Sequence, residues 1–305
     1  MSEEMVVRFW GVRGSHPVPG PRTVKFGGNT TCVEIQAGAH TIIIDAGTGI
    51  INLGDELLKR ATASGSKPVV ATIFFTHMHH DHTQGFPFFK PAYLGSSTLN
   101  ILGPKVFQHD LEQALGNAML PPSFPVSLDE LPSLKIVRNI SESDMIMLGA
   151  QPTDVRVMNF YHNQIDESPD IVKIRTYHSY AHPKNGVNCY RLMWRGKTVV
   201  FATDTEGYIE TDQRLVRFAH GADLLIHDAQ YRIEDYMNAK QPKQGFGHST
   251  PEMACAVAGS AGARRLVLTH HEPSYDDDTI SQIEHDAKKL FPQVCAAYEG
   301  LEIRL

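Results

Sequence analysis

A histidine-rich loop limits how this chain can fold more than any other part of its sequence. Residues 76–82 read Thr-His-Met-His-His-Asp-His and directly follow an apolar run at residues 69–75. The apolar run predicts a buried strand, and the polar residues predict a loop at its carboxyl end. Imidazoles and a carboxylate are typical ligands of divalent cations. Because these side chains cannot all reach one tetrahedral ion from a short loop, we interpret them as parts of two metal sites.

Four further motifs argue against the alternative, which is a solvated histidine-rich tract without metal. They are Tyr-Ala-His-Pro at 180–183, Phe-Ala-Thr-Asp-Thr-Glu at 201–206, Gly-His-Ser-Thr at 247–250 and Leu-Thr-His-His-Glu-Pro at 268–273. Together with the histidine-rich loop, they resemble in type and order the motifs of the metallo-β-lactamase fold superfamily. Within it, the chain resembles the phosphodiesterase branch related to tRNase Z and to bacterial and phage cyclic-nucleotide phosphodiesterases. The resemblance implies an α/β fold, a four-layer αββα sandwich.

The resemblance also implies ligands for two divalent cations. They are divided between a first ion (His77, His79, His182), a second ion (Asp81, His82, His270) and a bridging carboxylate (Asp204). A carboxylate suits the bridging position because each of its oxygens can bind one ion. His178 and His271 stay open as replacements for one of these ligands. Zinc is the first candidate for the metal, and manganese is the second.

Catalytic roles follow from the same resemblance. A hydroxide that bridges the two ions would attack the phosphorus, with Asp81 counted among the catalytic residues as well as the ligands. His248 would protonate the departing alkoxide, aided by a carboxylate that matches Glu206. The alternative for His248 is a histidine satisfied by its own loop at a helix start. Asp45 and residues 227–228 are expected around the ligands.

Charge and motif spacing indicate a small substrate. The net charge is −6, and residues 104–170, predicted as an acidic insertion, carry ten acidic and four basic residues. Proteins that grip a long polyanion usually present a basic surface. In tRNase Z, the arm that clamps tRNA lies between the third-motif histidine and the bridging aspartate, but only 21 residues separate His182 from Asp204.

We therefore predict hydrolysis of a small anionic phosphodiester, with a 3′,5′-cyclic nucleotide first, and expect no long nucleic acid as a partner. The alternatives are a nuclease like the endoribonuclease that processes tRNA 3′ ends, a non-catalytic metal-dependent sensor module, and a thioesterase-like hydrolase.

Length and composition predict one domain over residues 1–305, because ligands from His77 to His270 must converge. No apolar run reaches the ~18 residues of a membrane span, and the acidic N-terminus shows no secretory signal, so no membrane association is expected. Four separated cysteines are typical of reduced thiols and predict a cytoplasmic location. The resemblance adds a homodimer, with Phe124 as a candidate contact or as a cover of the pocket.

Overall fold

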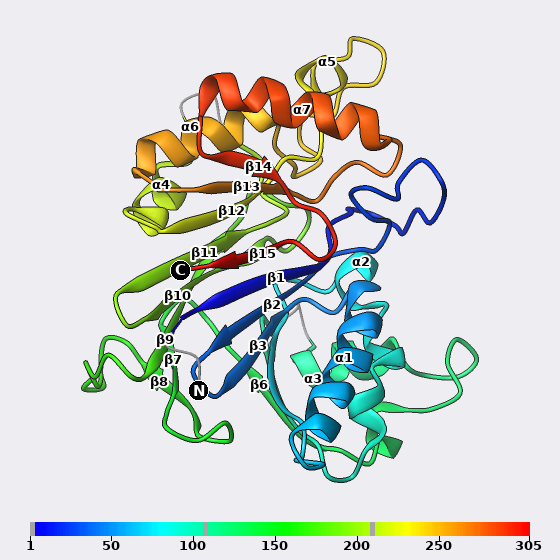
Figure 1. The fold of residues 1–305 in the computed structure, drawn as a ribbon, viewed down its shortest axis with the longest axis vertical. Helices are drawn as coiled ribbons and strands as arrows, with labels where there is room; N and C mark the ends of the chain where they lie inside the picture. The colour runs from blue at the N-terminus through cyan, green and yellow to red at the C-terminus, as the bar shows by residue number, and fades with distance from the viewer. Residues whose placement is uncertain (1–3, 106–108, 208–210) are drawn as a thin grey trace.

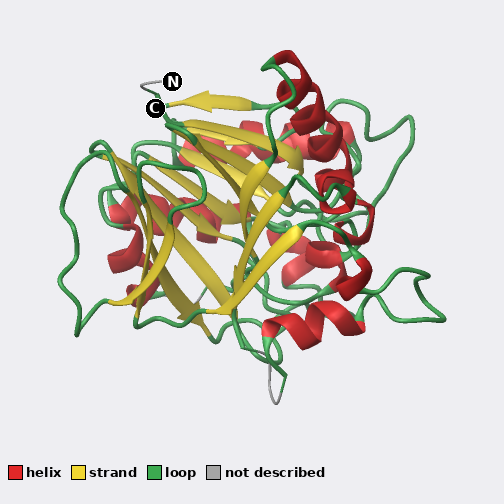
Figure 2. Ribbon diagram, turned by 90° about the horizontal axis from the view of Figure 1, so that it is seen from below, coloured by secondary structure: helices red, strands yellow, loops and turns green. Residues whose placement is uncertain are grey.

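Two β-sheets pack face to face in the computed structural model, which describes residues 4–105, 109–207 and 211–305 (Figures 1 and 2). Within these residues the first sheet has the spatial order β15 (Glu302–Arg304), β1 (Val6–Gly11), β2 (Cys32–Ala37), β3 (His40–Ile44), β4 (Val70–Phe74), β5 (Thr98–Gly103) and β6 (Leu134–Asn139). The second sheet has the order β14 (Val294–Ala296), β13 (Leu266–Thr269), β12 (Leu224–Asp228), β11 (Lys197–Ala202), β10 (Val187–Trp194), β9 (Val172–Ser179), β7 (Asp144–Leu148) and β8 (Val155–Asn159).

Helices cover the outer face of each sheet, as Figure 1 shows. The first sheet is covered by α1 (Gly49–Ala63) and α3 (Leu111–Asn117), and the second by α4 (Gln213–Ala219), α6 (Pro251–Ala261) and α7 (Asp277–Leu290). Short helices lie in the loops: α2 (His80–Thr83), α5 (Ile233–Tyr236), η1 (Phe86–Phe88), η2 (Lys90–Tyr93) and η3 (Leu128–Glu130). The predicted αββα sandwich is therefore confirmed.

Alternating strand residues fill the spaces between these layers. In β3, Ile42 and Ile44 face the opposite sheet, whereas Ile43 packs beneath α1. In β11, Phe201 faces the first sheet and Val200 packs among the helices of the outer layer. All five side chains are fully buried. Successive strand residues point to opposite faces of a sheet. Strands with apolar residues on both faces must therefore be covered on both sides, here by the other sheet and by helices.

Two sets of neighbouring parallel strands end at one edge of the sandwich. Strand β3 pairs in parallel with β4, and β12 pairs in parallel with both β11 and β13. The carboxyl ends of parallel strands meet at one edge of a sheet, which is where ligands usually bind in open α/β sheets. The histidine-rich loop follows β4, and the Asp204 and His270 motifs follow β11 and β13.

Residues 104–170, predicted as an acidic insertion, contribute to both sheets. They supply β6 to the first sheet and the β7–β8 pair to the second. The sequence of residues 107–119 has helical periodicity. Residues 107–108 lie outside the described part, and α3 begins at Leu111 with a capping box formed by Asp110 and Gln113. Phe124 packs against Phe88 of the same chain, with ring centroids 5.4 Å apart, and the homodimer stays a prediction.

The segment 230–239 contains only one helical turn, α5. Its first residues are held by other contacts: Gln230 N–H donates to the Asp228 carboxylate, and Tyr231 N–H donates to the Ser249 carbonyl. The backbone therefore becomes helical only at Ile233. None of the described helices combines the length and apolarity needed to span a lipid bilayer.

Candidate metal centre

The predicted ligands stand in loops at the strand edge, and part of their backbone is strained. Asp204 has φ of 52° and His270 has φ of 63°, as does Asp45 at 62°. The left-handed conformation costs a residue with a Cβ about 1–2 kcal/mol. Strain of this kind persists where the surrounding structure enforces it, and it is common at functional sites.

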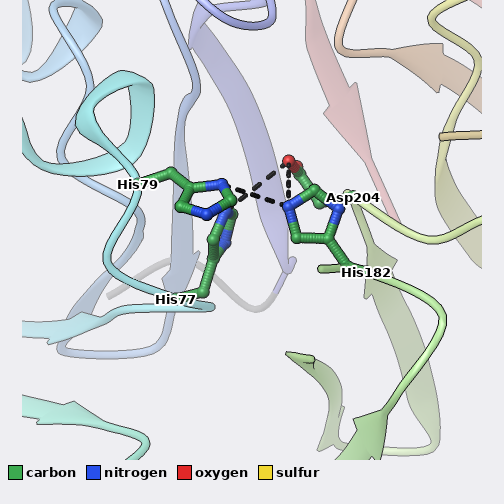
Figure 3. A group of neighbouring side chains, drawn as sticks. All are labelled: His77, His79, His182 and Asp204. Carbon is green, nitrogen blue, oxygen red and sulfur yellow. Dashed lines mark hydrogen bonds and ion pairs between the residues drawn. The ribbon is translucent and has the colours of Figure 1, made fainter. Parts of the chain in front are cut away.

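The first ligand group contains three imidazoles and one carboxylate, which point toward one another in Figure 3. His182 Nε2 lies 3.1 Å from His79 Nδ1. His77 Nε2 and His182 Nε2 each lie 3.6 Å from Asp204 Oδ2. His79 is exposed, and the other three side chains are buried.

The second ligand group contains two imidazoles and two carboxylates, and all four are buried. His82 Nε2 and His270 Nε2 are 3.3 Å apart, and each lies 3.2 Å from Asp204 Oδ1. Asp81 Oδ2 lies 3.1 Å from His270 Nε2. Asp204 therefore directs one oxygen to each group, the arrangement that a bridging ligand requires.

The nitrogen and oxygen atoms of the two groups are arranged better for binding divalent cations than for hydrogen bonding with one another. In each group two imidazole nitrogens face each other at about hydrogen-bond distance. His77 Nε2 is buried and has no hydrogen-bond partner among the described residues. A buried polar atom without a partner is unfavourable, and a cation that accepts its lone pair would remove the penalty. These groups could hold two divalent ions.

Neighbouring groups fix the orientation of the ligand histidines. Asp45 Oδ2 lies 2.7 Å from His82 Nδ1, and Gln230 Oε1 lies 2.9 Å from His270 Nδ1. With Nδ1 as the donor to these oxygens, each ring presents the Nε2 lone pair to the group. Asp45 itself is held by the N–H and hydroxyl of Thr76, at 2.8 Å and 2.9 Å.

His182 is oriented by a glycine. The Gly247 carbonyl lies 3.1 Å from His182 Nδ1. Gly247 has φ of +88°, and a Cβ at this position would lie 2.3 Å from the same ring nitrogen. Only glycine combines this backbone conformation with such a close approach.

The two groups differ in the proton affinity of their imidazoles. Burial lowers the pKa of His77 and His79 and lowers the pKa of His182 to about 4. Burial also opposes charge on His82 and His270, but the carboxylates around them, Asp204 above all, outweigh it. The pKa of His82 is therefore raised, and that of His270 is raised to about 9.

His248 has a carboxylate partner other than the one expected. Its Nδ1 lies 2.8 Å from Asp228 Oδ2, and its ring stacks on that of His270 with centroids 4.9 Å apart. Glu206 instead accepts hydrogen bonds from the Tyr236 hydroxyl at 2.6 Å and from two backbone N–H groups of residues 245–247. Asp228 also accepts the Asp204 backbone N–H at 3.0 Å, so it links His248 to the backbone of Asp204.

The remaining candidate histidines lie outside the ligand groups. His178 bonds to Asn188 Oδ1 and to the Asn185 carbonyl, at 2.8 Å and 2.9 Å. His271 Nε2 bonds to the Ala297 carbonyl, and burial lowers its pKa to about 3. His227 Nδ1 bonds to the Asp228 carbonyl.

Sequence reasoning did not identify the part that the loop between β1 and β2 plays in this centre. The Ser15 N–H donates to Asp81 Oδ2 at 2.7 Å. A Cβ on Gly14 would lie 2.4 Å from the His270 ring, so only a glycine lets the loop approach this closely. The glycines and prolines of residues 11–21 indicate an irregular loop but do not predict which residues it contacts.

Comparison with known proteins agrees with this fold. Residues 40–271 match the family model described as beta-lactamase superfamily domain. The chain is 26% identical to Ribonuclease Z of Bacillus subtilis strain 168 over 261 residues, which cover 77% of this chain and 81% of that protein. The solved structure of the metallo-β-lactamase fold protein YhfI from Bacillus subtilis aligns with 99% of this chain and 100% of its own, with 20% identity and a TM-score of 0.66.

The short form of human tRNase Z aligns with 98% of each chain, with 17% identity and a TM-score of 0.57. The expectation that no long nucleic acid is a partner is wrong, because the similar proteins include ribonucleases. Net charge averages over the whole surface, whereas bound divalent cations provide strong positive charge at one point. The family model covers more than half of the chain, so this metal-dependent hydrolase belongs to the β-lactamase superfamily. Within that superfamily it is related to tRNase Z.

Proposed function

We propose that the protein is a dinuclear metal-dependent phosphodiesterase that cleaves RNA, as the names of its relatives suggest. One observation carries the proposal: two ligand groups share Asp204, and His248, held by Asp228, stands beside them. Two divalent cations, zinc first and manganese second, would neutralise charge on the phosphate and acidify a bound water.

The remaining steps fall to side chains of the chain itself. Asp81 belongs to the second ligand group and is held by the Ser15 N–H. His248 is positioned to give a proton to the departing alkoxide, since Asp228 holds Nδ1 and Nε2 makes no hydrogen bond within the described residues. General acid catalysis by such a histidine typically contributes ~10²–10⁴-fold. Glu206 would act indirectly, because it holds the backbone of residues 245–247, which directly precedes His248.

Two cavities support a linear substrate. A cavity of about 520 Å³ borders His77 and His79, and another of about 810 Å³ borders His182. Pro183 and Lys184 line both cavities. Both cavities border the first ligand group, so a chain bound there through its phosphate could occupy both of them.

A small diester such as a 3′,5′-cyclic nucleotide is the second candidate. The observation that favours it is the tight hairpin of β10 and β11, in which Trp194 pairs with Lys197 and leaves only Arg195 and Gly196 in the turn. The 21 residues between His182 and Asp204 therefore contain no clamping arm. An RNA substrate would need another surface to hold its body.

The test is a comparison of substrates with one metal-loaded sample. A precursor tRNA with a 3′ trailer, a short single-stranded RNA and 3′,5′-cyclic AMP would be incubated separately, with metal content measured on the same protein. We expect cleavage of RNA. Hydrolysis of cyclic AMP alone would favour the second candidate, and hydrolysis of none would contradict the proposed function.

The cytoplasmic location stays a prediction, and all four cysteines are free thiols.

A further inference from the structure

The larger cavity beside the ligand groups has an unusual wall. It measures about 810 Å³, and its lining includes Tyr180, His182, Tyr236, Met237 and Gln244. This volume lies within the range of small-molecule sites, about 300–1,000 Å³. Because His182 belongs to the first ligand group, whatever fills the cavity would be adjacent to a phosphate bound there.

Large apolar side chains are exposed on this wall. Tyr180 is 77% exposed, Met237 57% and Ile233 38%, and all three line the cavity. Single exposed apolar residues are common on protein surfaces. Three that converge on one concave surface next to a catalytic centre indicate a site for a flat apolar group.

We infer that this cavity binds the base of a nucleotide whose phosphate lies at the ligand groups, with the Tyr180 ring as the stacking surface. The inference rests on the proposed function, since a phosphodiesterase of RNA must seat a nucleotide beside the scissile bond. Bases stack on aromatic side chains with little dependence on sequence because every base has a π-face. The lining Gln244 amide offers a donor and an acceptor to the polar edge of the base.

Glu206 connects the wall of the cavity to His182 of the first ligand group. Its carboxylate accepts the Tyr236 hydroxyl at 2.6 Å and the Gly247 N–H at 2.9 Å. The Gly247 carbonyl in turn contacts His182 Nδ1 at 3.1 Å. One carboxylate therefore joins the cavity wall to the imidazole that borders the phosphate position. Lys184, at the same wall, adds a positive charge for the substrate backbone.

The test is direct binding of two probes, AMP and ribose 5-phosphate, to metal-loaded protein by titration calorimetry. Both probes carry the phosphate, and only AMP carries a base. We expect wild-type protein to bind AMP roughly tenfold more tightly, within the range measured for base stacking on aromatic residues. Tyr180→Ala should reduce this preference to about one, Met237→Ala should reduce it partly, and Tyr180→Phe should keep it.

Tyr161→Ala is the matched control, because Tyr161 is 71% exposed and lies outside this cavity. Equal affinity of wild-type protein for the two probes, or no AMP binding at millimolar concentration, would overturn the inference. So would a Tyr180→Ala variant that loses affinity for both probes equally. The two failures are distinguishable: a protein that cleaves RNA but ignores the base contradicts only the base site, whereas one that prefers AMP but cleaves no RNA contradicts only the proposed function.

Discussion

The first and second ligand groups share Asp204 but differ in charge. The first adds three imidazoles, His77, His79 and His182, whereas the second replaces one imidazole with the Asp81 carboxylate. The extra carboxylate helps to retain a proton on His270, whose pKa is about 9, while burial lowers the pKa of His182 to about 4. The first group can therefore bind a cation at neutral pH without losing protons, but the second must release them.

Removal of the shared carboxylate should have the largest effect. We expect Asp204→Ala to lower RNA hydrolysis by roughly 10³-fold or more, as loss of a central electrostatic group does in other active sites, and to lower metal content in both groups. Turnover and metal content would be measured on the same sample, with the exposed Asp286→Ala as control. A variant that still holds two ions and turns over normally would show that the groups do not depend on Asp204.

His248 lies next to the second ligand group, because its ring stacks on that of His270. We expect His248→Ala to keep both ions and to lower RNA hydrolysis by about 10²–10⁴-fold. A diester with a p-nitrophenolate leaving group should lose far less, since this leaving group needs no proton. Equal losses for the two substrates would argue against proton donation by His248.

Asp45 contacts a ligand of the second group alone. Asp45→Asn should weaken the second ion by about 10–100-fold, as loss of a partner behind a ligand histidine usually does. Affinity for the first ion should fall less, because Asp45 contacts His82 directly but reaches His77 only through the Thr76 hydroxyl, which lies 3.0 Å from His77 Nδ1. Competition with a coloured chelator would resolve the two affinities. Equal weakening of both ions would contradict the separation of the groups.

Acid should weaken one ion before the other. Since the pKa of His270 is raised to about 9, its proton competes with the second cation at every pH below 9. Affinity for that cation should therefore fall by about tenfold per pH unit for each displaced proton between pH 8 and pH 6. The first cation should change little there, because the pKa of His182 is about 4. Calorimetry in buffers of different ionisation enthalpy would count the protons, and equal release by both ions would contradict the difference.

The sequence predicted that the candidate ligand side chains converge, because each apolar run ends in a polar motif. The run at 69–75 becomes β4 and part of its loop, and residues 197–202 form β11, which ends two residues before Asp204. Parallel pairing then brings these ends to one edge, which makes convergence of distant motifs a physical consequence of the fold.

Contacts between separate loops could not be predicted in the same way. The partner of His248 is Asp228, twenty residues away in another element, whereas the candidate Glu206 was chosen by resemblance alone. No local pattern distinguishes these carboxylates, because only the tertiary structure decides which one reaches the imidazole. The edge strand β15 was also missed, since three residues that alternate with charges give little periodic signal.

The most direct test of this metal centre is an anomalous-difference map from a crystal of the zinc-loaded protein. The two ligand groups predict two peaks, one among His77, His79 and His182 and one beside His82 and His270, with Asp204 between them. A single peak, or peaks away from these side chains, would contradict a dinuclear centre bridged by Asp204.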